Sequence, residues 1–187
     1  MGLIQLRIVF NISNHSTRWE IKMHNNLKKR SKQDRFLIFF VADELYGISV
    51  LNIKEIIKVV NIVKVPRTPD FLKGIINLRG KVVPVIDVRL KFGLEYREYD
   101  METCIIIVEM GDIMLGFIVD RVEDVVAFET LHASPAFGSH IDVSLLAGVV
   151  EIGSDVVMIL DLEKILDDGE LMEISEVDHT HEEHYVD

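Results

Sequence analysis

The chain has 187 residues, 49% of them hydrophobic, and a formal net charge of −11 at pH 7. This length allows one domain, or two small ones that share a core, and the apolar content is ample for burial. A net negative charge argues against nucleic acid as the main partner, because neutralising phosphates requires a cationic face. The longest apolar runs, at residues 36–42 and 104–108, are far shorter than the ~20 residues that span a bilayer. We therefore expect a globular chain without direct membrane insertion.

Residues 1–34 are predicted to form a basic, poorly ordered extension. This segment contains seven lysine or arginine residues against two acidic ones and has no clear hydrophobic periodicity. Arg7 interrupts its apolar start and no small-residue cleavage site follows, so a secretory signal is not expected.

Short apolar segments separated by turn residues begin at Arg35. RFLIFFV, LYGISVL, EIIKVV and IVKVP are rich in Val, Ile and Phe, which is typical of strands. Pro66 and Pro69 frame the next segment and predict a loop or a single helical turn. A second series of apolar segments begins at Thr103 and is followed by a predicted short helix at 162–168. Strands at this spacing, with little helix between them, favour small antiparallel barrels.

The second series repeats the first, which indicates an internal duplication. GIINLRGKVVPVID at residues 74–87 returns as GVVEIGSDVVMILD at 148–161, with glycine, apolar pairs and aspartate in the same positions. Upstream of these motifs, LYGISVLNIKEIIKV aligns with MLGFIVDRVEDVVAF. The motifs at 74–87 and 148–161 each predict a two-strand hairpin. We therefore expect a first barrel at about 35–100 and a second at about 101–162.

The two predicted hairpins differ at their turns, which read NLRG at residues 77–80 and EIGS at 151–154. Closing a hairpin calls for glycine or polar residues rather than arginine. Arg79 is therefore a candidate for a role beyond folding. The alternative is a solvated turn residue, or one ion-paired to Glu55 or Asp87 within its own barrel.

Two segments resemble the bacterial chemotaxis coupling protein family, CheW. They are YGISVLNIKEI at residues 46–56 and the pattern G-x-x-N-L-R-G-x-x-x-P-x-x-D at 74–87, and the resemblance covers about residues 36–166. It implies a mainly β fold of two SH3-like five-stranded barrels, no catalytic activity and no cofactor. Family members join the histidine kinase CheA to the cytoplasmic tips of chemoreceptors. The kinase has a related domain of its own, but this length leaves no room for kinase domains, so a freestanding adaptor is implied.

The implied partners are a CheA-type kinase, through its CheW-like regulatory domain, and the hairpin tips of methyl-accepting chemoreceptors. Other CheW-like domains, assembled in rings, are a further implied partner. The implied location is the cytoplasm, at membrane-associated receptor arrays. A parallel array that controls surface motility or another output is an open alternative, and an enzyme or small-ligand-binding barrel is a remote one. Against the remote alternative, the sequence has no Gly-rich phosphate loop, nucleophile motif or ordered metal spacing.

Carried over residue by residue, the resemblance implies a receptor-facing surface made of Ile53, Glu55, Asn77, Leu78 and Arg79. Docking a helical tip requires an apolar groove for its anchors and charges at the rim. Ile53 is the candidate for the first and Arg79 for the second. Core packing is the alternative for Ile53, and an exposed, partner-free position is the alternative for Glu55. The kinase-facing residues are not assigned.

Glycine and proline positions in the first hairpin motif are interpreted as structural. Gly74, Gly80 and Pro84 are expected to provide unusual backbone angles and to fix the hairpin turn. Cys104 lies in an apolar run, so we predict a buried thiol rather than a nucleophile. A single cysteine cannot form an internal disulfide, which agrees with a reducing cytoplasm.

No catalytic residue and no metal site are predicted. Asp87 and Asp161 each end an apolar arm, as turn residues usually do. Residues 169–187 are expected to be an acidic tail that buries little. Its His179, His181 and His184 are interpreted as solvated, because ligands on a flexible segment bind metal weakly.

Overall fold

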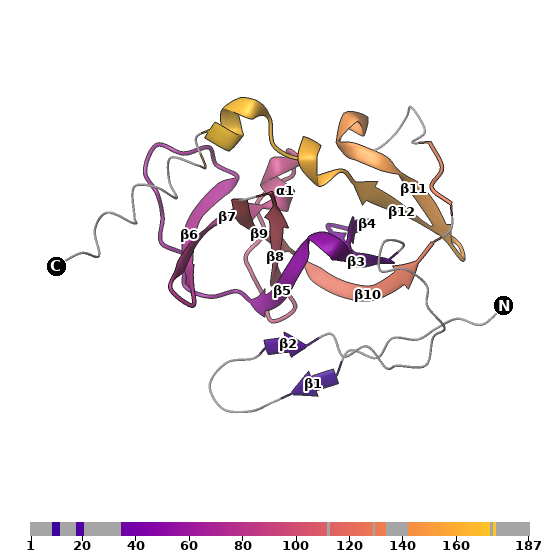
Figure 1. Cartoon of the computed structure of the whole chain (residues 1–187), viewed down its shortest axis with the longest axis horizontal. Helices are drawn as coiled ribbons and strands as arrows, with labels where there is room; N and C mark the ends of the chain where they lie inside the picture. The colour runs from indigo at the N-terminus through magenta and orange to yellow at the C-terminus, as the bar shows by residue number, and fades with distance from the viewer. Residues whose placement is uncertain are drawn as a thin grey trace.

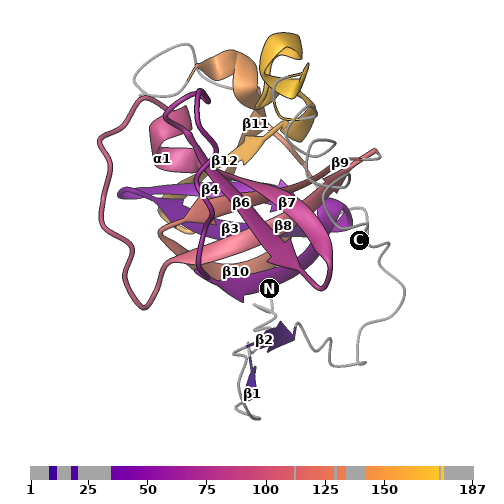
Figure 2. The same cartoon turned by 90° about the vertical axis from the view of Figure 1, so that its left-hand side faces the viewer.

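The computed structural model describes residues 9–11, 18–20, 35–111, 113–128, 130–133, 142–172 and 174. Its strands form two sheets around a shared core, and the short helical segments lie mainly along one side (Figure 1). Figure 2 shows the same molecule from its β6–β7 side, with these helical segments above the sheets. The predicted mainly β class is confirmed.

Ten strands belong to the duplicated region, five from each half of the chain. In the first half they are β3 (Arg35–Val41), β4 (Glu44–Ser49), β5 (Ile53–Lys58), β6 (Leu72–Leu78) and β7 (Lys81–Asp87). In the second half they are β8 (Cys104–Met110), β9 (Ile113–Val119), β10 (Arg121–Ala127), β11 (Leu146–Ile152) and β12 (Asp155–Leu160).

In the residues that the structure describes, helical segments are few and short. They are α1 (Val88–Lys91), the 3₁₀ turns η2 (Val50–Asn52), η3 (Val143–Leu145) and η4 (Leu162–Lys164), and helical backbone at 168–172 and 174. No helix in the described ranges is long and apolar enough to cross a membrane.

The strand order reveals that the two halves of the chain exchange a hairpin. The larger sheet has the order β1-β2-β5-β8-β9-β7-β6 and the smaller sheet has the order β10-β3-β4-β12-β11. β3 to β7 of the first half correspond in sequence order to β8 to β12 of the second half. With this correspondence, equivalent strands occupy the same places in the two sheets. The β3–β4 hairpin therefore lies with β10 to β12, and the β8–β9 hairpin lies with β5, β6 and β7. The expected division into barrels at 35–100 and 101–162 does not match this arrangement.

Two parallel pairings connect the exchanged hairpins to their sheets. β7 pairs with β9 from Val85 opposite Gly116, and β12 pairs with β4 from Val157 opposite Leu45. All other pairings of the ten strands are antiparallel. Parallel neighbours cannot be joined by a short turn, so these contacts form between segments that are distant in the chain.

A single bridge at equivalent places curls each sheet toward closure. Val63, after β5, and Ile75 exchange two backbone hydrogen bonds of 2.9 Å, and His132 and Val149 do the same after β10. The strand order of each sheet is nevertheless open in the described residues, so closed SH3-like barrels stay a prediction.

The repeated glycine of the two motifs lies beneath this crossing chain. A Cβ atom on Gly74 would lie 2.0 Å from the Val63 carbonyl oxygen, and one on Gly148 would lie 2.7 Å from the His132 carbonyl oxygen. Gly74 also has a φ of 137°, in the region that disfavours side chains. Both glycines therefore permit the close approach of two backbone segments.

Replacing Gly74 by alanine is expected to lower the free energy of unfolding by about 2–4 kcal/mol, since strain and a backbone clash add. The matched control is Gly153→Ala, because Gly153 also has a positive φ, 64°, but has open space around it. That variant should lose only about 1 kcal/mol. Equilibrium unfolding in urea measures both values, and equal losses would contradict the crossing-chain explanation.

The main core lies between the two sheets and extends beyond the expected end of the domain at residue 168. Its buried members include Leu37, Ile106 and, near the C-terminus, Leu166 and Ile174. Ile174 is only 1% exposed. The acidic tail expected at 169–187 therefore contributes at least one residue to the core, and residues 175–187 lie outside the described part.

At the N-terminus, the described backbone consists of β1 (Val9–Asn11) and β2 (Arg18–Glu20). β2 pairs with β5 next to Ile56 and Ile57, which adds a hairpin to the larger sheet. The rest of the extension expected at 1–34 lies outside the described residues.

Candidate functional site

The first hairpin closes through a two-residue turn made of Arg79 and Gly80. Leu78 pairs with Lys81 across the strands, and the turn residues have φ angles of 55° and 88°. Two positive φ values are the pattern of a type I′ turn, which glycine or asparagine adopts at low cost. The backbone at Arg79 therefore carries strain of about 1 kcal/mol or more. The Asn77 side chain stabilises the turn, because its Oδ1 accepts a hydrogen bond of 2.8 Å from the Gly80 N–H.

The side chain of Arg79 reaches across to β5. Its Nη2 donates to Glu55 Oε2 at 2.7 Å, and the side chains are 63% and 12% exposed respectively. The predicted alternative of an ion pair with Glu55 is thus present, whereas Asp87 accepts from the Tyr99 hydroxyl instead. Guanidinium has five N–H donors, so this contact leaves donors that face solvent. The ion pair and a contact with a partner protein are compatible.

A β-bulge in β5 sets the position of Glu55. Ile53 pairs with Val108 of β8 and Glu55 pairs with Ile107, so Lys54 is the extra residue between them. Such a bulge re-aims side chains locally. Lys54 forms an ion pair with Glu109 of β8.

The apolar candidates of this surface are partly buried. Ile53 packs against the main core, and Leu78 packs against a smaller cluster that includes Ile76 and Val83. Core packing, the alternative for Ile53, is therefore at least part of its role. Leu51, on η2 just before β5, is 52% exposed and was missed by the sequence analysis. It lies between Val50 and Asn52, and the sequence offers no sign that its side chain faces solvent.

The second copy of the hairpin serves as an internal comparison. Asp124 of β10 occupies the position of Glu55, and Gly153 occupies that of Arg79. Asp124 Oδ1 accepts a 2.7 Å hydrogen bond from the N–H of Val125, its own neighbour. Both copies therefore have an acidic residue at this strand position, Glu55 or Asp124. Only the first copy has an arginine at the turn, because the second has Gly153 there.

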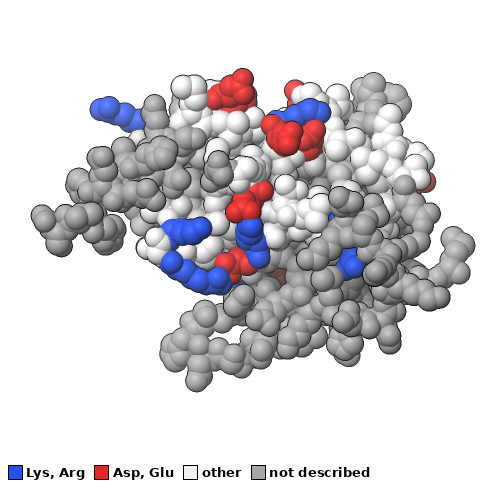
Figure 3. Space-filling view, in the orientation of Figure 1, with Lys and Arg blue, Asp and Glu red and all other residues white. Residues whose placement is uncertain are grey.

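Ile53, Glu55, Asn77, Leu78 and Arg79 are together termed the hairpin-tip surface. In the space-filling view, basic and acidic side chains alternate over the tip of the β6–β7 hairpin and over β5 (Figure 3). The structure thus brings the five predicted residues onto two neighbouring segments, the hairpin tip and the start of β5. The arrangement offers charged hydrogen-bonding groups beside limited apolar surface, a combination found at protein–protein interfaces.

Other residues singled out in the sequence have structural contacts. Asp87 caps α1 by accepting from the Leu90 N–H at 3.3 Å, and Asp161 caps η4 by accepting from the Glu163 N–H at 3.3 Å. Pro84 lies within β7 opposite Ile75 rather than in the turn. This placement corrects its interpretation as a turn residue, and it is tolerated because pairing with β9 begins one residue later.

No group of three or more His, Cys, Asp or Glu side chains that could hold a metal ion occurs among the described residues. His179, His181 and His184 lie outside them.

The thiol of Cys104 is buried at 3% exposure and donates to the Glu102 carbonyl oxygen at 3.0 Å. Burial raises the pKa of this thiol. A raised pKa lowers the thiolate fraction at pH 8, so we expect native protein to resist a thiol-specific chromogenic reagent at that pH. Denaturant should expose one reactive thiol per chain. Rapid and complete labelling of the native protein would contradict this protection.

Two sheets with exchanged hairpins and one asymmetric, charged turn define an internally duplicated all-β protein with a surface suited to recognition. A family model described as the CheW-like domain matches residues 35–170. The chain therefore belongs to the CheW-like family.

Relatives with known names agree with this assignment. The chain is 35% identical to the chemotaxis protein CheW of Klebsiella aerogenes over 148 residues, which cover 78% of this chain and 89% of that protein. It is also 35% identical to the chemotaxis protein CheW of Helicobacter pylori over 133 residues, covering 71% and 81%. Among solved structures it is similar to the scaffolding protein TtCheW from Thermoanaerobacter tengcongensis, with a TM-score of 0.68 and 34% identity. That similarity covers 74% of this chain and 95% of TtCheW.

Proposed function

We propose that this chain is a non-catalytic scaffold of bacterial chemotaxis signalling that links chemoreceptor tips to a CheA-type histidine kinase. The observation that carries the proposal is the CheW-like family match over residues 35–170, which spans almost all of the packed region. Two further findings support it. Relatives of this chain are named chemotaxis proteins, and TtCheW is named a scaffolding protein.

The receptor tip docks on the hairpin-tip surface in this proposal. A receptor tip is a helical hairpin, which needs apolar contacts for its anchors and charges that fix its register. Leu51 and the exposed part of Ile53 are suited to the first role. Arg79 is suited to the second, because a guanidinium can hold a carboxylate or a backbone oxygen at two points. Glu55, held at 2.7 Å, orients that guanidinium.

The mechanism is coupling rather than chemistry. The scaffold binds receptor and kinase at once, and its contacts differ between the receptor's signalling states, so that a receptor change alters kinase activity. The kinase-side partner is the CheW-like regulatory domain of the kinase, and further CheW-like domains join in rings. The proposed location is the cytoplasm, at membrane-associated receptor arrays.

Co-purification of the tagged protein from its own host tests this function. We expect a histidine kinase and chemoreceptors to be recovered together, and the untagged host serves as the control. A reconstituted assay provides the functional measurement: adding the protein to receptor-containing membranes and kinase should raise kinase autophosphorylation. Recovery of neither partner, together with unchanged autophosphorylation, would overturn the proposal.

A further inference from the structure

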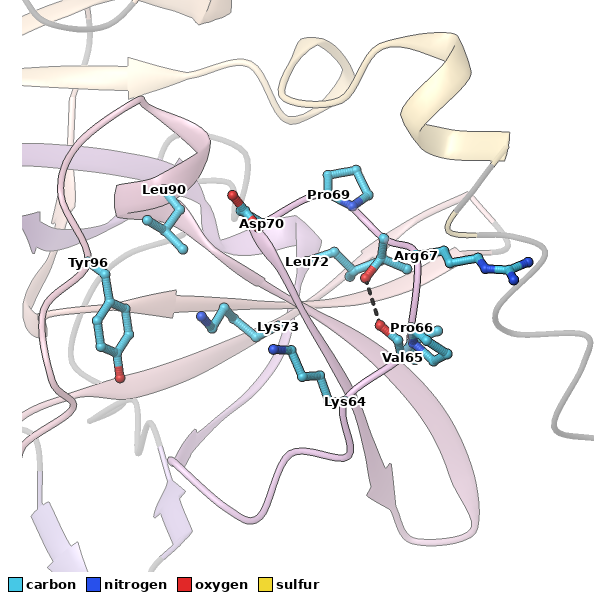
Figure 4. A pocket seen from close by; sticks show the side chains of 11 residues that line it. Lys64, Val65, Pro66, Arg67, Pro69, Asp70, Leu72, Lys73, Leu90 and Tyr96 are labelled. Carbon is cyan, nitrogen blue, oxygen red and sulfur yellow. Dashed lines mark hydrogen bonds between the residues drawn. The ribbon is translucent and has the colours of Figure 1, made fainter.

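A hollow of about 640 Å³ lies at the start of β6, whereas the turn of the hairpin-tip surface follows the end of this strand. The loop before β6, the first residues of β6, α1 and the loop after α1 line the hollow (Figure 4). Its volume is in the range of about 300–1,000 Å³ that is usual for small-molecule sites. Leu72 and Leu90 contribute apolar surface to its wall, and Lys64 and Lys73 contribute charge. We refer to this hollow as the basic pocket.

The basic pocket is cationic in a chain whose net charge is −11. Lys64, Arg67 and Lys73 line it, together with one acidic residue, Asp70. In the part of the chain that the structure describes, no carboxylate lies within ion-pair distance of these three cations. Like charges close together repel one another, so an anionic occupant would be stabilised there.

Two lysines converge inside the basic pocket. The side chains of Lys64 and Lys73 run beside one another on the side facing Tyr96, whereas Arg67 points away from them (Figure 4). The Lys73 ammonium group lies 4.7 Å from the centroid of the Tyr96 ring, a cation–π contact that holds the lysine in place. The pocket thus presents a pair of ammonium groups, with the guanidinium at its rim.

A buried anchor supports the aromatic side of the basic pocket. Tyr96 is 53% exposed, but its ring meets the ring of Tyr99 edge-on, with the centroids 5.7 Å apart. The Tyr99 hydroxyl donates a 2.9 Å hydrogen bond to Oδ2 of Asp87, which is 1% exposed. The exposed ring that contacts Lys73 is therefore fixed in position through its neighbour.

The loop on the other side is also fixed by its own hydrogen bonds. Thr68 Oγ1 donates to the Val65 carbonyl oxygen at 3.0 Å, and the Leu72 N–H donates to the Pro69 carbonyl oxygen at 2.9 Å. Both walls are thus formed in the unliganded chain. A pre-formed site loses less conformational entropy on binding than one that must first become ordered.

The second copy of the fold has no lysine at either position. The residue after the bridging residue that follows β5 or β10 is Lys64 in the first copy and Ala133 in the second. The residue before the repeated glycine is Lys73 in the first copy and Ala147 in the second. Because the same backbone arrangement forms with alanine at both positions, the lysine pair is not a requirement of the fold.

We propose that the basic pocket binds a small organic anion in which a carboxylate or phosphate group is joined to an apolar body. The ammonium groups of Lys64 and Lys73 bind the anionic group through charge-assisted hydrogen bonds. The apolar body packs against Leu72 and Leu90, which line the same hollow. This site is separate from the hairpin-tip surface, so it adds a ligand to the proposed scaffold function.

A nuclear magnetic resonance titration of the full chain with phenyl phosphate tests this proposal. Phenyl phosphate is the probe because it joins a phosphate group to an apolar ring. We expect saturable shifts of the backbone amide signals of residues 64–73, with a Kd of about 1 mM or lower. Inorganic phosphate should bind at least about fivefold more weakly, since it lacks the apolar ring.

Two variants separate a specific contact from general charge. The double variant Lys64→Ala, Lys73→Ala introduces the residues of the second copy and should raise the Kd for phenyl phosphate at least about tenfold. The matched control is Arg67→Gly, which removes a positive charge at the rim of the same pocket, at a φ of 65° that glycine adopts freely. It should change the Kd by less than about twofold, because exposed charges act weakly at a distance in salt.

Three results of the titration would overturn the proposal. They are the lack of saturable shifts up to about 10 mM phenyl phosphate, an unchanged Kd in the lysine double variant, and equal affinity for inorganic phosphate, which would indicate an adventitious ion only. Co-purification with the double variant distinguishes a small anion from an acidic partner protein. Recovery of kinase and receptors should equal that of the parent chain. Loss of either would assign the lysines to a protein contact and overturn the small-anion site.

Discussion

Arg79→Glu is expected to weaken binding to a chemoreceptor tip at least about tenfold, which corresponds to about 1.4 kcal/mol. The side chain of Arg79 is 63% exposed, so the change removes solvent-facing donors without opening the core. It also places a second carboxylate beside Glu55, which is 12% exposed, and like charges there repel an acidic contact on the partner. The fold should persist, with the unfolding midpoint changed by only a few degrees.

Calorimetric titration with a receptor cytoplasmic fragment measures this effect. Lys81→Glu is the control, because it changes the net charge equally and lies on the same hairpin just after the turn. It should change affinity far less. Receptor affinity equal to that of the parent chain in Arg79→Glu would refute the assignment of Arg79.

A charge swap distinguishes partner contact from internal support. If Arg79 serves only to pair with Glu55, the double variant Glu55→Arg, Arg79→Glu should regain affinity, because the ion pair is rebuilt. We expect no recovery, since the guanidinium would then extend from β5 rather than from the turn. The coupling energy from the full cycle of single and double variants separates the two roles.

Neither half of the duplicated region is expected to fold alone. A fragment of residues 35–100 has β5, β6 and β7 without β8 and β9, which lie between them in the larger sheet. It also loses Ile105, Ile106 and Leu115, each 0% exposed in the intact chain. Loss of several fully buried side chains, each worth about 2–5 kcal/mol, exceeds the stability of an ordinary domain.

Circular dichroism and urea unfolding of the separate fragments 35–100 and 101–174 provide the measurement. Each alone should show no cooperative transition, whereas co-expression of the two should restore one that resembles that of the intact chain. A fragment 35–100 that unfolds cooperatively by itself would show that the exchanged hairpin is dispensable. An independent barrel, as the sequence analysis expected, would then be the better description.

Arg79 illustrates how far a candidate site can be predicted from an amino-acid sequence. The contrast between NLRG and EIGS at the two turns singled it out, because arginine is a poor turn residue. Two internal partners, Glu55 and Asp87, were equally open at that stage. Only folding decides between them: Glu55 lies 2.7 Å from the guanidinium, whereas Asp87 is buried and bonded to Tyr99. Leu51 was missed because the sequence does not show whether Val50 or Leu51 faces solvent.

The repeated glycine shows the same limit. Its recurrence at Gly74 and Gly148 was evident in the sequence, but its reason was not, since Val63 and His132 lie outside the repeated motif. The hollow of about 640 Å³ beside β6 is a similar case. Lys64 and Lys73 are separated by a proline-framed loop, and the chain does not reveal that Tyr96 and Leu90 complete the hollow.

Local chemistry thus suffices for the strands, the hairpins and the duplication, because turn residues and apolar alternation act between near neighbours in the chain. The exchange of hairpins between the two sheets depends on contacts of another kind. The parallel pairings of β7 with β9 and of β12 with β4 join segments far apart in the chain. Because the two copies have similar apolar strands, the sequence alone does not show which copy each hairpin pairs with. The choice is made by the burial of one common core, which exists only once both halves have folded together.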